Sequence, residues 1–191
     1  MTYEFETFCG DCRKAYDKST GEADLEVIRQ NLEKLIKENP GFIEEKCGDS
    51  ADYGVHELYT DPQMGFIVYA HNIKEGRKSP PHDHGASWAV YGQAKKFTDM
   101  TEYRRLDDKS EAGHAEIEET KNYRLEFGMA GKFGPHDIHQ IHFEDEARFI
   151  RVTGADLFKE NTLTYDPENN SVNIIGTGSA ADNSRAGPNQ E

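Results

Sequence analysis

The chain is poor in cysteine, in basic residues and in long apolar runs. Its three cysteines are an odd number and too few for the disulfide framework of a small secreted domain. The longest apolar run, residues 66–70, is far too short to cross a bilayer as a helix. The first residues, MTYEFETFCG, have neither the basic region nor the apolar stretch of a secretory signal peptide. We therefore expect a cytoplasmic protein.

Basic side chains are outnumbered by acidic ones: 22 Lys and Arg stand against 36 Asp and Glu, a formal net charge of −14. Binding to nucleic acid or to an anionic membrane needs clustered basic residues, so we expect neither partner. The acidity is uneven, since residues 51–100 hold 6 acids against 5 bases. We expect the excess charge on the solvated surface and a functional cavity lined by neutral side chains, helped by Arg148 or Arg151.

The 191 residues fit one domain that carries an N-terminal extension. Apolar residues recur at helical spacing over residues 20–38, with Ser19 and Glu22 as a predicted capping box and residues 39–41 (Asn-Pro-Gly) as the end. We assign residues 1–50 to a helical segment that packs on the rest of the fold. The residues that set the helical spacing are Leu25, Ile28, Leu32, Leu35 and Ile36.

From about residue 55 the hydrophobic period changes from helical to strand-like. Short aromatic and β-branched runs alternate with turn residues, which is typical of a β-sandwich or barrel. We assign residues 51–175 to this β domain and interpret residues 107–119 as a polar loop or the tip of a hairpin. Residues 176–191 are rich in Gly, Ser, Asn and Pro, and we predict that they are disordered. The predicted strands are residues 66–73, 88–91, 123–127, 140–143, 147–153 and 172–175.

Cys9 and Cys12 form an isolated CxxC motif. A zinc site would need a second cysteine pair, and the only other cysteine is Cys47. A thioredoxin-like site would need a βαβ setting, which the sequence lacks. We interpret the motif as structural or incidental.

Five of the eight histidines fall into two clusters. His82 and His84 form a His-x-His pair, which on a strand would place both imidazoles on one face because side chains alternate with period two. The second cluster, His136, His139 and His142, follows a Gly-Pro turn. Two imidazoles from one strand and a third from a neighbour can hold a metal ion and leave positions open for substrate or oxygen. The alternative is that these are ordinary surface or core histidines.

The two clusters resemble the two motifs of the cupin superfamily. In the first motif Gly76 precedes His82-x-His84 by five intervening residues, and Gly92 follows after a short strand; the second motif covers residues 128–139. The resemblance implies an all-β fold, the cupin double-stranded β-helix. This fold is a small β-barrel, here preceded by the N-terminal helical segment.

Two further segments, 61–66 (DPQMGF) and 81–85 (PHDHG), are similar to the cysteine dioxygenase family of thiol dioxygenases. The resemblance covers about residues 20–155. It implies an enzyme, a non-haem Fe(II) dioxygenase that uses O2 to oxidise a small thiol-containing or related organic acid. Iron is the expected cofactor, nickel, zinc and manganese are the other candidates, and the oligomeric state is left open.

Carried over residue by residue, the resemblance makes His82, His84 and His139 the metal ligands. The glutamate that many cupins place four or five residues after the second histidine is absent, because Trp88 and Ala89 stand there. Thiol dioxygenases use such a three-histidine site. Three neutral imidazoles leave the ion its full positive charge, which favours direct binding of an anionic substrate such as a thiolate.

The expected catalytic residues are His56, Tyr91 and Arg151. His56 stands where the family has the arginine that binds the substrate carboxylate, which argues against cysteine itself as substrate. Arg148 and Arg151 are the other candidates for binding an anion, and either face of their strand can look into the barrel. Asp137 stays open as a further ligand because it has the strand parity of His139.

Two other functions compete with an oxygenase. One is a non-redox metal-dependent cupin, an isomerase or lyase, in which the ion acts as a Lewis acid and Tyr91 or His56 as a general base. The other is a small-molecule-binding cupin without turnover. Fold alone cannot decide between them, because one fold hosts many chemistries.

Overall fold

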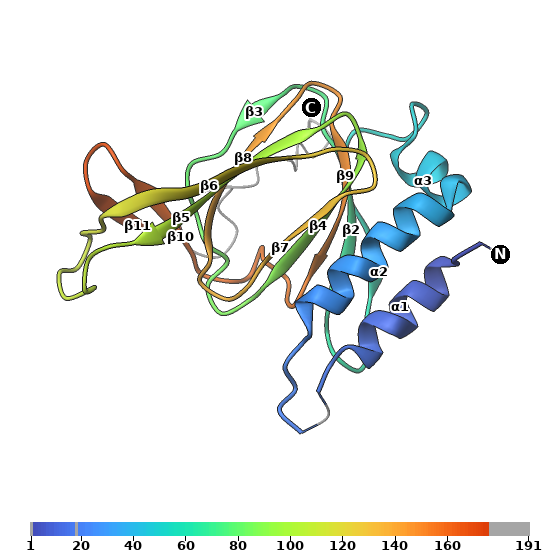
Figure 1. Cartoon of the computed structure of the whole chain (residues 1–191), viewed down its shortest axis with the longest axis horizontal. Coiled ribbons are helices and arrows are strands. Elements are labelled where there is room, and N and C mark those ends of the chain that lie inside the picture. The colour runs from blue at the N-terminus through green and yellow to red at the C-terminus, as the bar shows by residue number, and fades with distance from the viewer. Residues whose placement is uncertain (1, 18, 176–191) are drawn as a thin grey trace, which may run out of the picture.

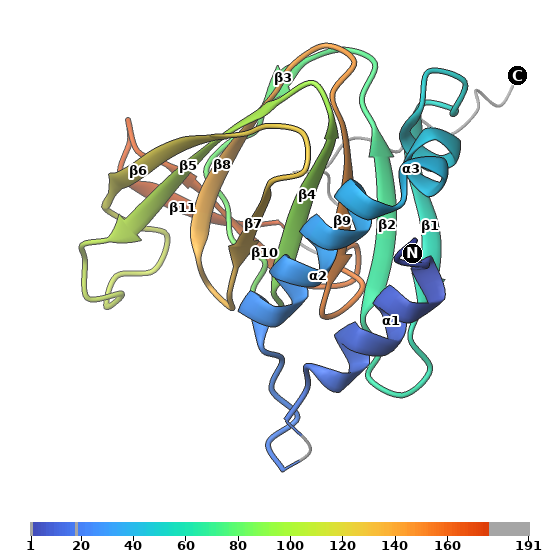
Figure 2. The same cartoon turned by 45° about the vertical axis from the view of Figure 1, so that its right-hand side comes forward.

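The computed structural model describes residues 2–17 and 19–175, which form a two-sheet β-barrel with three helices against one outer face (Figures 1 and 2). The fold is mostly β, and its helical layer makes it mixed rather than purely all-β as expected. The predicted disordered tail, residues 176–191, lies outside the described residues. Within the described ranges, no helix has the length and apolar character needed to cross a bilayer.

Three helices, α1 (Phe5–Lys14), α2 (Leu25–Glu38) and α3 (Pro40–Cys47), precede the strands. The predicted helix is α2, but its N-cap is Asp24, whose side chain accepts hydrogen bonds from the backbone N–H groups of Glu26 and Val27, and not the expected capping box. Pro40 does not end the helical segment. It is the first residue of α3, a position that needs no N–H donor, so one predicted helix boundary is the start of another helix.

Two antiparallel sheets face each other across the barrel. The larger has the strand order β1-β2-β9-β4-β7 and the smaller β3-β8-β5-β6, while β10 and β11 form a hairpin of their own. Every predicted strand overlaps an observed one, whereas β1, β3, β5, β7 and β10 have no predicted counterpart. The bounds are β1 (Gly54–Thr60), β2 (Ile67–Asn72), β3 (Arg77–Lys78), β4 (Ala89–Lys95), β5 (Thr98–Arg105), β6 (Ile117–Leu125), β7 (Ala130–Phe133), β8 (Ile138–Phe143), β9 (Arg148–Thr153), β10 (Thr162–Asp166) and β11 (Ser171–Ile175).

The larger sheet is covered on both faces, by the helices on the outside and by the barrel interior on the inside. The direction of each side chain therefore decides which of the two it contacts. On β9, Ile150 and Val152 pack in the core beneath the helices, whereas Phe149 and Arg151 point into the barrel. All residues of β2 and β9 are accordingly buried. The inner face of β9 is therefore the one that can contribute to a site inside the barrel.

Gly92 lies on β4 where side chains of α2 pack directly against the sheet. A Cβ atom at this position would lie 2.5 Å from Cδ1 of Ile36 and 2.7 Å from Cγ of Leu32. We expect Gly92→Ala to lower the free energy of unfolding by about 1–3 kcal/mol through overpacking, as measured by urea denaturation. Gly10→Ala in α1 is the control, because a Cβ there meets no atom within 4 Å and should leave stability unchanged or raise it by up to about 1 kcal/mol. Equal losses in both variants would contradict the packing argument.

Asp61 ties α1 to the turn between β1 and β2. Its buried carboxylate accepts hydrogen bonds from Nε of Arg13 at 2.8 Å, from the Tyr59 hydroxyl at 2.9 Å, and from the backbone N–H groups of Gln63 and Met64. Burial alone would raise the pKa of Asp61, but these donors outweigh it and lower the pKa to about 2.

This carboxylate makes the fold sensitive to acid. Because the folded-state pKa of Asp61, about 2, lies below the unfolded value of about 3.9, its stabilising effect is present above pH 4 and is lost as the pH falls toward 2. We expect Asp61→Asn to lower the free energy of unfolding by about 2 kcal/mol at pH 7 and to flatten its decline between about pH 4 and 2. Urea midpoints measured across this range test both effects. An unchanged acid slope in the variant would show that other carboxylates cause it.

Candidate metal centre

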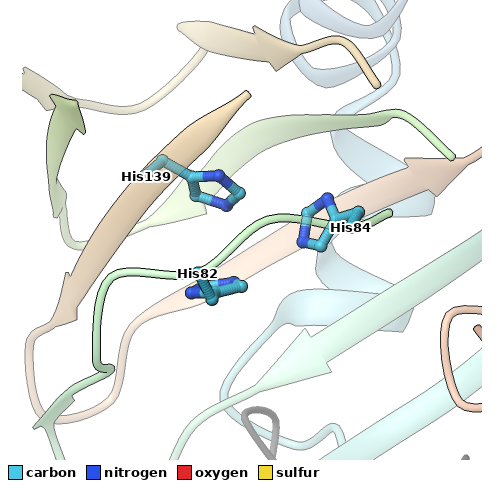
Figure 3. Close-up of side chains that lie close together, drawn as sticks. All are labelled: His82, His84 and His139. Atoms are coloured by element: carbon cyan, nitrogen blue, oxygen red, sulfur yellow. The ribbon is translucent and has the colours of Figure 1, made fainter. Parts of the chain in front are cut away.

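Three buried histidines meet inside the barrel. His82, His84 and His139 each offer one ring nitrogen, and these three atoms lie within 4.8 Å of one another. Figure 3 shows the rings converging from two separate stretches of chain, the segment before β4 and strand β8. The three residues are at most 6% exposed. Across residues 2–17 and 19–175 no second group of three His, Cys, Asp or Glu side chains is placed to hold a metal ion.

Backbone pairing brings two of the three histidines together. The N–H of His82 donates to the carbonyl of His139 at 2.8 Å, and the N–H of His139 donates to the carbonyl of His82 at 2.9 Å. Directly opposed residues place their side chains on the same face, and the two ring centroids are 4.5 Å apart. The His-x-His pair was considered as part of a strand, but the segment lies between β3 and β4 and belongs to neither; only His82 pairs there with neighbouring chain, opposite His139 and Thr164.

The hydrogen bonds of the rings leave nitrogen lone pairs directed at the cluster. Nδ1 of His82 lies 3.0 Å from the carbonyl of Pro80, and Nδ1 of His139 lies 3.4 Å from the carbonyl of Asp137. A carbonyl only accepts, so both Nδ1 atoms carry the proton and both Nε2 atoms carry a lone pair. Nε2 of His139 and Nδ1 of His84 are buried with no hydrogen-bond partner among the described residues. Leaving such atoms unsatisfied is costly, and a bound metal ion would satisfy them.

Two of the three imidazoles, those of His84 and His139, are held in the neutral form that binds metals. The pKa values of His84 and His139 lie well below the ordinary histidine value, mainly because burial disfavours the charged ring. His82 and the guanidinium of Arg151 lower both pKa values further. Metal ligation requires neutral imidazole, and a set of three imidazole nitrogens suits a divalent transition metal.

A small cavity of about 40 Å³ opens beside His82 and His84. None of its lining residues, all of which the structure describes, is Asp or Glu, which agrees with the expected absence of carboxylates. Arg151 is the one Lys, Arg, Asp or Glu residue among them. The other polar lining residues are Ser79, Tyr91 and Thr162, and the apolar ones are Ile141, Phe143, Phe149, Leu157 and Phe158.

The two candidate arginines lie on opposite faces of β9. Arg151 lines the cavity, and its guanidinium lies 5.4 Å from the centre of the Tyr69 ring. Arg148 points to the other side of the sheet, where it donates to the carbonyl of Ala51 at 2.9 Å and lies over the ring of Tyr53. Only Arg151 can therefore meet a ligand in the cavity.

Two aromatic side chains fix the histidine rings. The hydroxyl of Tyr91, which is on β4, lies 3.3 Å from Nε2 of His84. The ring of Phe133 stacks on that of His139 with centroids 3.9 Å apart. Tyr91 is thus the second predicted catalytic residue that the structure brings to the cluster, and Phe133 is one that the sequence did not single out.

His56 does not belong to the site, which corrects its prediction as a catalytic residue. The register of β1 against β2 shifts between Glu57 and Tyr59, so His56 lies opposite Ala70, which packs beneath the helices. Without this bulge His56 would lie opposite His71, on the inner face. Its Nε2 instead lies 3.0 Å from the carbonyl of Asp52.

The remaining candidates fall outside the cluster. Asp137 and the two other histidines of the second motif, His136 and His142, are exposed, and Trp88 is part of the core beneath the helices. Leu157 and Phe158 also line the cavity, but the sequence analysis did not identify them. The one sequence signal for them is that an aliphatic and an aromatic residue stand together in an otherwise polar stretch.

The CxxC motif lies on α1, and its two thiols are buried and unreactive. Cys9 and Cys12 are both buried in the core between the helices and the sheet. Burial raises the pKa of the Cys9 thiol to about 12 and also raises that of Cys12, so neither thiol ionises near neutral pH. The structural interpretation of the motif fits this placement.

Comparison with known proteins gives only distant likenesses. No protein-family model and no curated protein matches the chain. Similar solved structures include the DMSP lyase DddQ from Ruegeria pomeroyi (TM-score 0.42, 12% identity, covering 61% of this chain and 53% of that one). Others are the cupin domain of Cnp3 from Schizosaccharomyces pombe (0.41, 9%, 56% and 66%) and the hydroquinone 1,2-dioxygenase PnpCD (0.42, 10%, 58% and 69%). Likenesses of this degree carry no argument about binding or activity.

The chain has a cupin-like fold by its own architecture. Two antiparallel sheets enclose a barrel, and the His-x-His segment before β4 meets a third histidine on β8 inside it. These are the features that the cupin motifs in the sequence led us to expect.

Proposed function

We propose that the protein is a metal-dependent enzyme of the thiol dioxygenase type, which oxidises a small thiol-containing organic acid at a three-histidine Fe(II) centre. The observation that carries the proposal is the convergence of three buried imidazole nitrogens beside a cavity that no carboxylate lines. His82, His84 and His139 would hold the ion. When bound, the ion would supply the redox chemistry with O2 that side chains alone do not provide.

The charges of the site favour an anionic substrate. Three neutral ligands do not offset the charge of a divalent ion, and Arg151 adds a fixed positive charge to the same cavity. A guanidinium binds a carboxylate with two parallel hydrogen bonds, which orients the ligand as well as holding it. We therefore assign Arg151 as the anchor of the substrate carboxylate, in place of His56.

Tyr91 and the apolar walls have separate roles. The Tyr91 hydroxyl, 3.3 Å from Nε2 of His84, is placed to donate a proton to a group bound next to the histidines or to accept one from it. Phe143, Phe149 and Phe158 line the cavity and give it an apolar wall, which would favour the exclusion of water when a substrate is bound. The small volume of the cavity, about 40 Å³, favours a short-chain substrate.

Metal analysis followed by oxygen uptake tests the proposal. We expect protein purified without added metal to contain iron and to consume O2 with a short-chain thiol carboxylate, with loss of the free thiol. The matched controls are a thiol amine of similar length, which lacks the carboxylate, and a carboxylate without the thiol; both should be poor substrates. Iron-loaded protein that consumes no O2 with any thiol acid would refute the dioxygenase assignment.

A non-redox lyase or isomerase is the second candidate, because Tyr91 also places a proton donor and acceptor beside the cluster. Zinc, nickel or manganese in the purified protein, together with no O2 uptake, would favour it. Metal or ligand binding with no turnover of any kind would favour a binding protein. The cytoplasmic location and the absence of nucleic-acid and membrane partners stay predictions from the sequence.

A further inference from the structure

Strands β10 and β11 form a hairpin, and β10 contacts the His-x-His segment as a neighbouring strand would. The N–H of Tyr165 donates to the carbonyl of Pro81 at 2.9 Å, and the N–H of Asp83 donates to the carbonyl of Leu163 at 3.0 Å. His82, between them, exchanges its backbone hydrogen bonds with His139 on β8 instead. Successive residues of this short segment are thus held from both sides, by β8 and by β10.

Asp83 lies between the two candidate ligands and is directed toward this hairpin. Its carboxylate is fully buried and accepts hydrogen bonds from the Tyr165 hydroxyl at 2.9 Å, from the N–H of Gly85 at 2.9 Å and from the N–H of Leu163 at 3.3 Å. A buried carboxylate is costly unless donors satisfy it. Here the three donors fix the conformation of the chain on both sides of His84.

Tyr165 joins the two stretches of chain that supply the ligands. Its hydroxyl bonds to Asp83, next to His82 and His84, while its ring packs in a small core with Ile138, the residue before His139. One side chain therefore contacts the neighbours of all three histidines without lining the cavity.

We propose that Asp83 and Tyr165 are positioning residues of the metal centre, whose hydrogen bond sets the placement of His82 and His84 relative to His139. The proposal rests on metal binding by the three histidines. Loss of a group that orients a ligand typically weakens metal binding by about 10–100-fold.

Binding of Co²⁺ to the full chain tests this without an activity assay. We expect Tyr165→Phe to weaken Co²⁺ binding by about 10-fold or more and to change the visible absorption of the bound ion, which reports its coordination geometry. The matched control is Tyr59→Phe, which removes the same kind of bond, a tyrosine hydroxyl donating at 2.9 Å to the buried carboxylate of Asp61. It should alter stability but neither the affinity nor the spectrum.

Asp83→Asn provides a second variant if Tyr165→Phe does not fold. Its amide keeps one acceptor oxygen but has lost the second one, so we again expect weaker binding; its control is Asp61→Asn. Wild-type affinity and spectrum in either folded variant would overturn the proposal. If the wild type itself binds no Co²⁺, or binds it equally well after His139→Ala, the metal centre is refuted and this inference with it.

Discussion

Replacing His139 with alanine is expected to weaken divalent metal binding by about 10²–10³-fold. The apparent free energy of a structural metal site with four ligands, about 10–16 kcal/mol, amounts to roughly 2.5–4 kcal/mol for each ligand, and each 1.4 kcal/mol is a factor of ten. In His139→Ala only two of the three converging nitrogens remain. Metal content after purification and titration with Co²⁺ both measure the loss.

The control is His142→Ala on the same strand. His142 lies three residues further along β8 and is exposed, so its removal should leave metal binding unchanged. A full metal content in His139→Ala would show that the assigned centre is wrong. Equal losses in both variants would point to a general effect of altering β8.

Stability without metal gives an independent signature of the same site. Without metal, His139 has a buried Nε2 with no hydrogen-bond partner in the part of the chain that the structure describes, which lowers the stability of the wild type. His139→Ala removes this cost but also the stacking contact with Phe133. Because the two effects offset each other, we expect the metal-free variant to be no less stable than the metal-free wild type. Added metal should raise the unfolding temperature of the wild type alone, because a ligand stabilises only the state that binds it. Thermal unfolding with and without Co²⁺ measures both effects.

The ligands could be predicted from the sequence because their signal is local. The His-x-His pair and the glycine-flanked third histidine are short patterns, and His82, His84 and His139 indeed meet. The helix α2 was predictable for the same reason, since its apolar residues recur within a few turns. Its start was not, because Asp24 competes with Ser19 as the cap and only the folded chain shows which one accepts the hydrogen bonds.

Features that depend on strand register could not be predicted. A single extra residue between Glu57 and Tyr59 turns His56 to the outer face of the sheet, and no turn or glycine in the sequence marks this bulge. The sequence likewise could not show which face of β9 points into the barrel. All residues of β9 are buried, so polar and apolar residues do not alternate along the strand. The role of Asp83 depends on Tyr165, a partner 82 residues away in the sequence.

Replacing Arg151 with glutamine is expected to raise KM for a thiol carboxylate by about 10–100-fold and to change kcat little. A hydrogen bond to a charged group contributes about 1.5–3 kcal/mol, and an anchor that binds the substrate equally in the ground and transition states acts on KM alone. Arg151 is the one Lys or Arg among the described residues that line the cavity, so no neighbouring cation can replace it there. Steady-state O2 uptake at varied substrate concentration measures the split.

Three comparisons make this result specific. Arg104→Gln, which removes an exposed arginine paired with Glu118, should leave both constants unchanged. Metal content should be equal in all variants, because Arg151 is not a ligand. Finally, the rise in KM caused by Arg151→Gln should be confined to substrates that carry a carboxylate. The variant and the wild type should therefore oxidise a thiol amine equally well. An equal loss for the thiol amine would mean that Arg151 supports the histidine cluster rather than the substrate, and the anion would then have to bind elsewhere.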